Sequence, residues 1–352
     1  TKTDRRFSCA FDYRASRTRQ RGCCVVRSRF ACASLIGCTI LASPHSFADA
    51  IHEPLWVENL SPLAALVALP SQRSADIREG MSVTLHSDVA THFVSQANED
   101  ERVFFDGETQ RHSLGLRWGI SSDWELSAVV PIARHSGGFT DGYVNRWHDF
   151  FGMPDGGRTE VSEDQLRYEF SSPEQQVSLV DSSSGLGDMT FELAYMAERQ
   201  RDLQIAYAVG YKASTGQRRD WNGSGSSDLY AVTRFSGAHR SDLPLYWHGQ
   251  LGVTALGDSP LMGPQQKNWL WFGGLSAEWH FNQQWALIAQ IDSHAALLDS
   301  SLDALGEPAA MLSLGLRRQF SRHWAVDISF AEDIVVESAP DIIFQASVHY
   351  RP

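Results

Sequence analysis

Cysteine does not occur after residue 38 of this 352-residue chain. The region that holds all five cysteines also has the features of an export signal: Arg27 and Arg29 precede an apolar stretch over residues 30–42, and Ala48-Asp49-Ala50 forms an A-x-A cleavage site. Cleavage after Ala50 would leave no cysteine, which excludes disulfides, thiol nucleophiles and thiolate metal sites. We therefore expect residues 1–50 to be a leader that is removed on export. The cysteines are Cys9, Cys23, Cys24, Cys32 and Cys38.

The start of this leader is unusual. Residues 1 to about 24 are too long and too rich in arginine for the first part of an ordinary signal peptide. They indicate a start site placed too far upstream, or a non-native extension. An alternative cleavage box of the lipoprotein type lies at Leu35-Ile36-Gly37-Cys38, but the downstream A-x-A site is better formed.

Long apolar runs and basic residues are also scarce. No stretch approaches the roughly 20 apolar residues of a membrane-spanning helix. Residues 1–50 hold nine of the 30 Lys and Arg and three of the 42 Asp and Glu, so the rest keeps 21 basic and 39 acidic residues, a net charge of −18. Such a charge disfavours a nucleic-acid partner.

What the chain does have, from about residue 80, is alternation of apolar and polar residues. Alternation predicts β-strands with one apolar and one polar face. A hydrophobic content of only 43% suits a membrane barrel as well as a soluble protein, because each lipid-facing residue is followed by a lumen-facing one. Most of the predicted strands have about the 9–11 residues of a tilted membrane strand. They are 80–93, 108–120 (or from Arg102, with a break at Asp106-Gly107), 124–133, 187–198, 203–213, 228–236, 244–254, 268–280, 285–294, 310–318, 323–332 and 341–350.

Tryptophan recurs beside the short turns between these strands. One phrase, an apolar residue, three polar residues and tryptophan, occurs at 120–124, 281–285 and 320–324. A soluble hairpin tip has little reason to carry tryptophan, whereas membrane barrels have aromatic girdles at headgroup level. We expect one girdle at the short-turn side, and Trp269 and Trp271 at the opposite side. The short-turn girdle comprises Trp118, Trp124, Trp247, Trp279, Trp285 and Trp324.

The connections predict the topology. Short links at 121–123, 199–202, 237–243, 281–284 and 319–322 alternate with long links at 94–107, 134–186, 214–227, 255–267, 295–309 and 333–340. Short periplasmic turns and long extracellular loops are typical of transmembrane barrels with an even strand count. A soluble β-sandwich or lipocalin-like fold does not predict this alternation. We therefore expect an all-β, antiparallel, up-and-down transmembrane barrel of about 12 strands over residues 80–352.

Two segments fall outside this pattern. Residues 51–79 do not alternate, and they could form a plug inside the barrel, a periplasmic lead-in, or a clip on the first strand. Loop 134–186 is long and rich in aromatics, and could fold inward, cap the barrel or bind a ligand. Its candidate residues are Trp147, His148, Asp149 and Arg158.

The polar face of the strands supplies the lumen candidates. Mixed charges there suit either a narrow water-filled pore or an interior closed by ion pairs. Gln290, Asp292 and His294 share one face, most simply as a lumen hydrogen-bond network. Ser293 and Ser313 have no sequence context that marks a nucleophile. We expect no metal site and no cofactor. The lumen candidates are His86, Asp88, Arg117, Glu125, Glu278, His280, Asp292, His294 and Arg317, with His92, Lys212, His248, Asp327 and His349 on the same face.

Several passages resemble one known family. They are the hairpin 115–131, the start at Asn59-x-x-Pro62-Leu63 that ends at Leu69-Pro70, the loop 146–158, and residues 182–188. Together they resemble the domain-of-unknown-function family numbered 3187, exported proteins of Gram-negative bacteria, over roughly residues 52–350. The resemblance implies an outer-membrane location and brings no catalytic residues. One departure is that Tyr350 is followed by Arg351 and Pro352, which displaces the terminal aromatic that the barrel assembly machinery reads.

These observations lead to one expected function and two alternatives. We expect a channel or transporter for a small, possibly hydrophobic, solute in the bacterial outer membrane, gated by loop 134–186. The alternatives are a barrel-embedded lipid hydrolase that uses serine and histidine, and a structural or adhesive barrel that acts through its loops. The expected partners are the lipid bilayer, lipopolysaccharide, the barrel assembly machinery and the solute.

Overall fold

Most of the chain after residue 49 is described by the computed structural model. The described residues are 50–152, 157–200, 202–239, 243–335 and 338–352. The expected leader lies outside them except for Ala50. Among the described residues, no helix combines the length and apolar character needed to cross a membrane.

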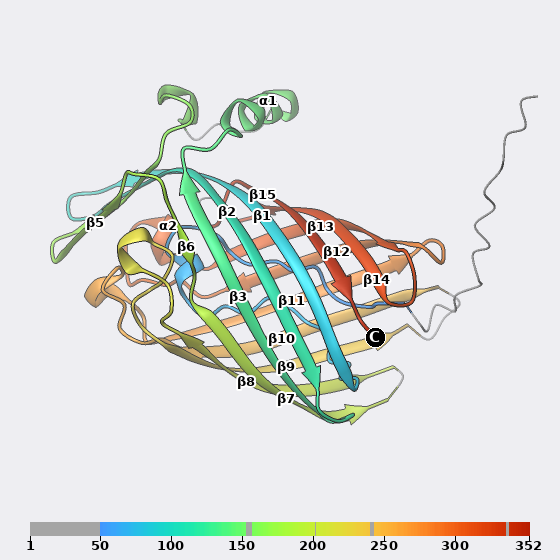
Figure 1. Ribbon diagram of the computed structural model, residues 1–352. Coiled ribbons are helices and arrows are strands. Elements are labelled where there is room, and N and C mark those ends of the chain that lie inside the picture. The colour runs from blue at the N-terminus through green and yellow to red at the C-terminus, as the bar shows by residue number, and fades with distance from the viewer. Residues whose placement is uncertain (1–49, 153–156, 201, 240–242, 336–337) are drawn as a thin grey trace, which may run out of the picture. The chain divides into compact units, whose positions relative to one another are not determined.

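Twelve antiparallel strands form a closed barrel, as predicted (Figure 1). Each strand pairs with its sequence neighbours in the barrel, and β1 closes the ring by pairing with β15 from Val83↔Tyr350 to Thr91↔Ile342. The predicted strand ends are correct to within a few residues for ten of the twelve. The barrel strands are β1 (Gly80–Ala97), β2 (Arg102–Gly119), β3 (Trp124–Ser136), β7 (Met189–Arg199), β8 (Gln204–Ala213), β9 (Asp228–Ala238), β10 (Leu245–Ala255), β11 (Trp269–His280), β12 (Trp285–His294), β13 (Ala309–Gln319), β14 (Trp324–Asp333) and β15 (Ile342–Tyr350).

The expected long link at 94–107 is wrong. β1 and β2 stay paired up to Ala97↔Arg102, and only residues 98–101 connect them. The alternative start of this strand at Arg102 is therefore correct, but the Asp106-Gly107 pair does not break the strand. Gly107 lies within β2 at φ 149°, where a Cβ would come within 3.2 Å of the Tyr168 ring. Glycine therefore serves a close approach of two segments here, and not a turn.

Loop 134–186 folds into its own elements, which the sequence did not predict. After β3 come α1 (Asp141–Phe151), the 3-10 turn η3 (Arg158–Glu160), and strands β4 (Arg167–Ser172), β5 (Gln175–Leu179) and β6 (Ser183–Leu186). β4 pairs with the extended part of β2, β5 pairs with β4, and β6 pairs with β3. Figure 1 shows α1 beyond the end of β3. Single strands this short lack a strong period-two signal, and each of them depends on pairing with a neighbouring strand, β4 on the extended part of β2 and β6 on β3.

Apolar residues from several loops form a cluster at the long-loop end of the barrel. It joins Leu63 and Leu66 of the N-terminal segment to Phe105, Tyr168 and Trp221. Leu261, Met262, Leu298 and Leu302 complete it from the loops after β10 and β12. Because these side chains are buried against one another, the loops cover this end of the lumen. The segments that contribute to the cluster contain four short elements: η2 (Ala64–Leu66), η4 (Arg218–Asp220), η5 (Gly263–Gln265) and α2 (Asp303–Gly306).

Residues 51–79, called the plug below, lie inside the barrel. None of residues 50–77 is exposed, and Figure 1 shows this blue segment running among the strands. The plug pairs with no strand of the sheet. Its backbone is instead hydrogen-bonded by side chains of the wall, since a buried peptide group needs a partner.

These plug bonds come from β9, β10, β12, β13 and β15. Gln290 accepts from the Leu55 N–H at 2.9 Å and donates to the Leu55 carbonyl at 3.2 Å. Asp228 accepts from the Ala68 N–H at 2.9 Å, and Thr254 donates to the Ala68 carbonyl at 2.7 Å. Further bonds join Gln319 to Ile51, Gln345 to Trp56, Gln250 to Pro70, and Ser236 to Ala75.

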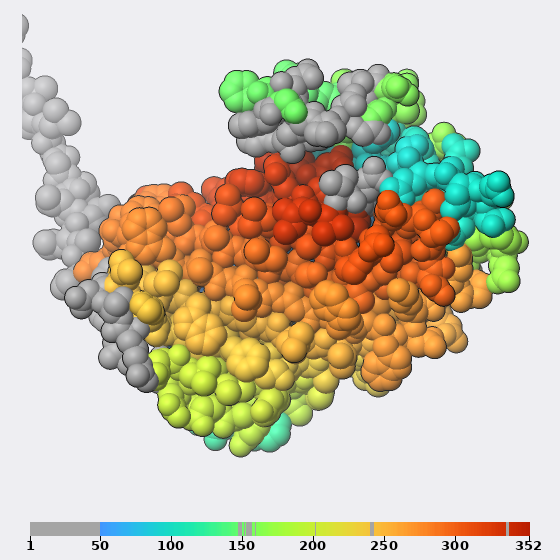
Figure 2. Space-filling model, turned by 180° about the vertical axis from the view of Figure 1, so that it is seen from behind, coloured from blue at the N-terminus to red at the C-terminus, as the bar shows by residue number. Residues whose placement is uncertain are grey.

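The outer face of the barrel is apolar. Large exposed side chains occupy alternate positions along the strands, among them Leu275, Ile291, Ile328 and Leu251. Figure 2 shows this face over the strands coloured from yellow to red. The inward neighbours of these residues, such as Ser276 and Gln290, are buried. The wall therefore separates an apolar outside from a polar inside, as a membrane barrel requires.

A charge at mid-strand on the outer face should destabilise the barrel. Leu275 is 70% exposed near the middle of β11, so we expect Leu275→Arg to lower the free energy of unfolding by about 2–4 kcal/mol in phospholipid vesicles. The control is Phe281→Arg in the turn after β11, with an expected loss of about 0–1 kcal/mol. Urea titration checks both values, and equal losses would contradict the membrane placement.

Removing one plug bond should loosen the plug and leave the barrel folded. Gln290→Leu leaves both polar groups of Leu55 without the partner shown here, at a cost of about 1–3 kcal/mol, or roughly ten- to hundredfold faster amide exchange locally. Hydrogen exchange of the Leu55 amide measures this effect. Gln284→Leu, in an exposed turn, is the control. Unchanged exchange at Leu55 would show that Gln290 does not hold the plug.

Candidate functional site

The lumen candidates all lie on the inner side of the barrel wall. Eight of the nine are buried, and Arg117 is half-buried. Each strand points them inward because successive side chains alternate between the two faces. The buried eight are His86, Asp88, Glu125, Glu278, His280, Asp292, His294 and Arg317. Seven of the nine fall into three groups that contact different parts of the plug, and His86 and Asp88 form a separate array with Ser347.

The first group holds the plug through Glu53. Arg117 on β2 and Arg351 each lie 2.7 Å from Glu53 Oε1, and Arg117 Nε also donates to Glu125 at 2.9 Å. Burial alone would raise the pKa of Glu53, but the two guanidinium groups hold it well below its usual range. Glu53 is therefore ionised at neutral pH and forms a charged anchor for the plug.

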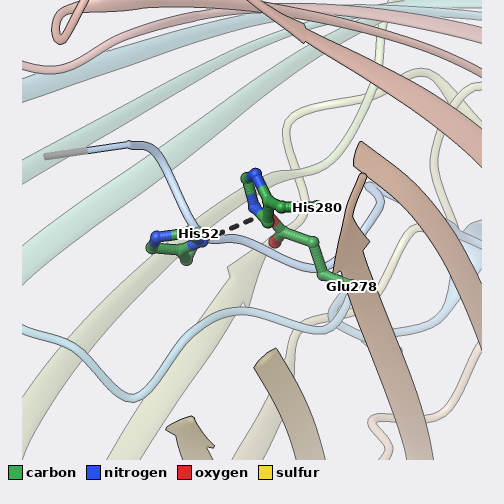
Figure 3. Close-up of side chains that lie close together, drawn as sticks. All are labelled: His52, Glu278 and His280. Atoms are coloured by element: carbon green, nitrogen blue, oxygen red, sulfur yellow. Dashed lines mark hydrogen bonds and ion pairs between the residues drawn. The ribbon is translucent and has the colours of Figure 1, made fainter. Parts of the chain in front are cut away.

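The second group surrounds Glu278 on β11, and Figure 3 shows its histidines. His280, two residues along the same strand, contacts Glu278 Oε1, and His52 Nδ1 of the plug lies 3.1 Å from the same oxygen. Arg317 bonds the other oxygen at 3.1 Å, and it also pairs with both oxygens of Asp327 at 2.7 and 2.6 Å. Two imidazoles, a carboxylate, and a guanidinium whose charge is offset by Asp327 therefore meet at the short-turn end of β11.

The third group centres on β12. Asp292 accepts hydrogen bonds from Gln72 at 2.7 Å and Gln290 at 2.8 Å. His294 lies 2.9 Å from the Asn59 amide through Nε2 and 2.8 Å from the Ala295 carbonyl through Nδ1. Both nitrogens of His294 thus have partners, and Ser293 donates to the Ala309 carbonyl instead. This group binds the plug, and it does not pair His294 with a serine.

Ser–His–carboxylate contacts do occur elsewhere in the lumen. Ser347 Oγ lies 2.8 Å from His86 Nδ1, and His86 Nε2 lies 2.7 Å from Asp88 Oδ1. A similar array joins Thr84, His349 and Asp327. The first array is buried and lies beneath the plug residue Trp56, whose ring stacks on His86 at 5.1 Å. Recurrence around the wall is typical of hydrogen-bond networks that order an interior.

The loop candidates have different positions. Trp147, His148 and Asp149 lie in α1, and their side chains fall outside the described part of the structure. Arg158 is buried, donates to Asp141 at 3.0 Å and pairs with Asp341 before β15. Burial raises the pKa of Asp141 despite this guanidinium. Arg158 therefore links loop 134–186 to the loop that precedes β15.

The tryptophans predicted as a girdle lie within three residues of strand ends that flank short turns. Trp118, Trp124, Trp279 and Trp324 are exposed, and Trp247 and Trp285 are half-buried. Arg318 lies over the Trp285 ring at 4.8 Å. Trp269 and Trp271 are exposed at the opposite end of β11. These positions are those that an interfacial belt of aromatics would need.

A cavity separates the plug from one side of the wall. It is lined by plug residues from Trp56 to Arg73 and by side chains of β2, β3, β8 and β9 together with residues 187–190. About 90 Å³ of it is open to the centres of water molecules, where one water needs roughly 10–15 Å³. The charged side chains at its edge are paired, since Glu58 contacts Arg111 at 2.9 Å and Lys212 contacts Asp188 at 2.7 Å.

The wall beside this cavity is interrupted. β3 pairs with β7 up to Val129↔Thr190 and with β6 from Ile132↔Leu186 onward. Between these pairings, Pro131 lacks an N–H, and the Gly187 N–H donates to its carbonyl at 2.8 Å. A Cβ on Gly187 would lie 2.9 Å from the Pro131 ring. Glycine is therefore required where the chain crosses this seam.

Several residues at these sites were not singled out from the sequence. They belong to the plug, whose lack of alternation gave no face to assign: His52, Glu53, Glu58, Gln72 and Arg73. The alternation of the strands does find their partners on the wall. A signal was present in the charges, because Glu53 and Glu58 meet Arg117 and Arg111 on β2. Matching the acidic residues of the non-alternating segment with the basic residues on the polar face of the strands would have identified the segment as a plug.

Solved structures that resemble this fold are outer-membrane channels and transporters. An outer membrane channel from Pseudomonas putida F1 is 11% identical with a TM-score of 0.50, over 78% of this chain and 96% of that one. The NanC porin (8% identical, TM-score 0.43) covers 78% of this chain and 100% of its own. The Ralstonia pickettii toluene transporter TbuX (10% identical, TM-score 0.39) covers 78% and 90%. At these identities the likeness shows the fold alone.

Comparison at the level of sequence gives a family. No curated protein matches the chain. The family described as "Protein of unknown function (DUF3187)" matches residues 31–351, nearly the whole chain. That match agrees with the resemblance of the hairpin 115–131 and the three other passages, and the chain belongs to the DUF3187 family.

Proposed function

We propose that this protein is a gated channel or transporter for a small uncharged solute in the outer membrane of a Gram-negative bacterium. The observation that carries the proposal is the cavity between the plug and the wall formed by β2, β3, β8 and β9. A barrel with only a structural role has no need for such a space beside its plug. Here the space has room for several waters, and a small solute could replace them.

The plug supports gating and argues against a wide, permanently open pore. It occupies the lumen, and the apolar cluster of the loops covers the long-loop end. The plug is held by separate side-chain bonds and not by pairing within the sheet. Such bonds break one at a time, each at a net cost of about 0.5–1.5 kcal/mol. The segment can therefore shift without unfolding the barrel.

The chemistry of the cavity favours an uncharged, partly apolar solute. Val129, Ala133, Trp221 and Tyr230 supply apolar surface, and Thr109 and His135 supply polar groups. Thr109 Oγ1 and His135 Nδ1 lie 3.0 Å apart. Since the charged groups at the edge are already paired with one another, a charged solute would have to displace a partner at a desolvation cost.

The proposed location explains the outer surface and names the partners. The apolar strand faces and the exposed tryptophans would contact the lipid bilayer and lipopolysaccharide. Removal of the leader after Ala50 would place the start of the plug at the short-turn end, where Ile51 binds Gln319. Tyr350, which contacts Trp324 at 4.9 Å between ring centroids, is the aromatic that we propose the assembly machinery reads.

The two alternatives have less support. For a lipid hydrolase, His294 is bound to Asn59 and Ala295, and the Ser347–His86–Asp88 array lies buried under Trp56. Neither serine nor histidine there is open to a lipid. For adhesion, loop 134–186 would act from outside, but its Arg158 and Tyr168 are buried in contacts with the rest of the protein. The interior cavity favours passage.

Filling the cavity should block passage. Ala133 lines the cavity from β3, so we expect Ala133→Phe to slow the entry of arabinose, as a small neutral probe, into proteoliposomes roughly tenfold or more. The measurement is the swelling rate relative to protein-free vesicles. The matched control is Ala128→Phe, on the outward face of the same strand, with an expected rate within about twofold of the wild type.

Both variants must first show heat-modifiable migration, which reports a folded barrel. Swelling by the wild type that equals protein-free vesicles would overturn the proposed passage of small neutral solutes. Equal rates in the wild type and the Ala133→Phe variant would place the route outside this cavity, and would contradict the assignment of the cavity as its binding site.

A further inference from the structure

We propose that His52, Glu278 and His280 form a binding site for a divalent transition metal of the zinc class, which joins the plug to the barrel wall. The three side chains each direct one ligand atom into a common space, and these atoms all lie within 4.8 Å of one another. Figure 3 shows His52 approaching from the plug, while Glu278 and His280 come from one strand.

The ligand set suits zinc better than a hard cation. Two imidazoles and a carboxylate are the protein ligands of many Zn²⁺ sites that keep a fourth position open. Calcium and magnesium prefer oxygen ligands alone. The distance of 3.1 Å from His52 Nδ1 to Glu278 Oε1 is close to the separation of neighbouring ligands around one tetrahedral ion with bonds of about 2.0–2.2 Å.

His248 on β10 lies beside the cluster, outside the set of three ligand atoms. Its Nδ1 lies 2.9 Å from Ser236 Oγ, which directs Nε2 toward Glu278. His248 Nε2 is buried, has no hydrogen-bond partner among the described residues, and lies 4.0 Å from Glu278 Oε2. A buried imidazole nitrogen without a hydrogen bond is costly unless something else satisfies it. His248 Nε2 is not among the ligand atoms that lie within 4.8 Å of one another, so it would have to move inward to reach an ion held by the other three residues.

The surrounding groups are arranged as supports for metal ligands. Arg317 holds Glu278 Oε2 at 3.1 Å, which leaves Oε1 directed at the two histidines. The charge of Arg317 is offset by Asp327, whose two oxygens it binds at 2.7 and 2.6 Å. A dication would therefore meet two imidazoles and a carboxylate that shares its guanidinium partner with Asp327. Such outer partners fix the orientation of metal ligands.

The site is reached from the side of His52, and the aromatic ring of Tyr246 covers it. His52 is 12% exposed, whereas Glu278 is fully buried. Tyr246 stacks on the His52 ring at 3.5 Å between centroids. The site lies at the short-turn end of β11, next to the turn 281–284. An ion bound there would tie the start of the plug to β11 and strengthen the closed arrangement, independently of which solute the cavity accepts.

Cobalt(II) titration of the purified, chelator-treated protein without the leader tests the site, because tetrahedral Co²⁺ absorbs visible light and zinc does not, and because the five cysteines of the leader would bind Co²⁺ themselves. We expect one equivalent of Co²⁺ to give tetrahedral absorption bands that Zn²⁺ removes by competition. We expect His52→Gln and Glu278→Gln each to weaken Co²⁺ binding roughly tenfold or more. Binding should also weaken at acid pH, because metal ligands must be deprotonated to bind the ion.

The control is His294→Gln, another buried lumen histidine that binds the plug, for which we expect unchanged affinity. Heat-modifiable migration verifies that each variant is folded. If Glu278→Gln fails that check, His52→Gln still tests the site, because it changes a plug residue and leaves the barrel wall unchanged. In the wild type, Zn²⁺ should slow hydrogen exchange at residues 51–57. Absence of tetrahedral bands, or equal Co²⁺ affinity in the wild type and the His52→Gln variant, would overturn the site.

Discussion

The need to satisfy a buried, irregular backbone governs the interior of this barrel. Residues 51–77 lie in the lumen without strand pairing, so their N–H and C=O groups cannot be left to the sheet. Gln290, Asp228 and Thr254, from three different strands, bond this backbone directly. The polar face of the wall therefore serves first as the hydrogen-bonding environment of the plug, and only secondarily as the lining of a pore.

The cavity and the Glu278 cluster both follow from this arrangement. Where wall side chains reach the plug, the lumen is closed by direct bonds, as at Gln290 and Asp292. Where the wall is interrupted at Pro131 and Gly187, a space remains beside the plug. At the short-turn end, the charged groups of the plug compensate charges of the wall, since buried charges need partners. The same segment thus blocks the lumen, bounds the cavity and supplies His52 to the cluster.

The strands and their inward residues could be predicted from sequence, and the contacts among those residues could not. Alternation placed His86, Glu278 and Arg317 on the polar face, because the two-residue period is a local property of a strand. The β1–β2 connection was misjudged because Gly107 resembles a turn signal, but its actual role is to admit Tyr168 from a strand that is distant in sequence. The elements of loop 134–186 were missed for the same reason, since β4 pairs with β2, a strand that is distant in sequence.

The sequence by itself determined the barrel: twelve strands, their two faces, and the tryptophans beside the short turns, all of which are set by residue order within a few positions. Only the tertiary structure decided what fills the barrel. His52 and Glu278 are 226 residues apart, and nothing local to either one records that they meet. A strand specifies which way its side chains point, but closure of the ring and threading of the plug specify which of them come together.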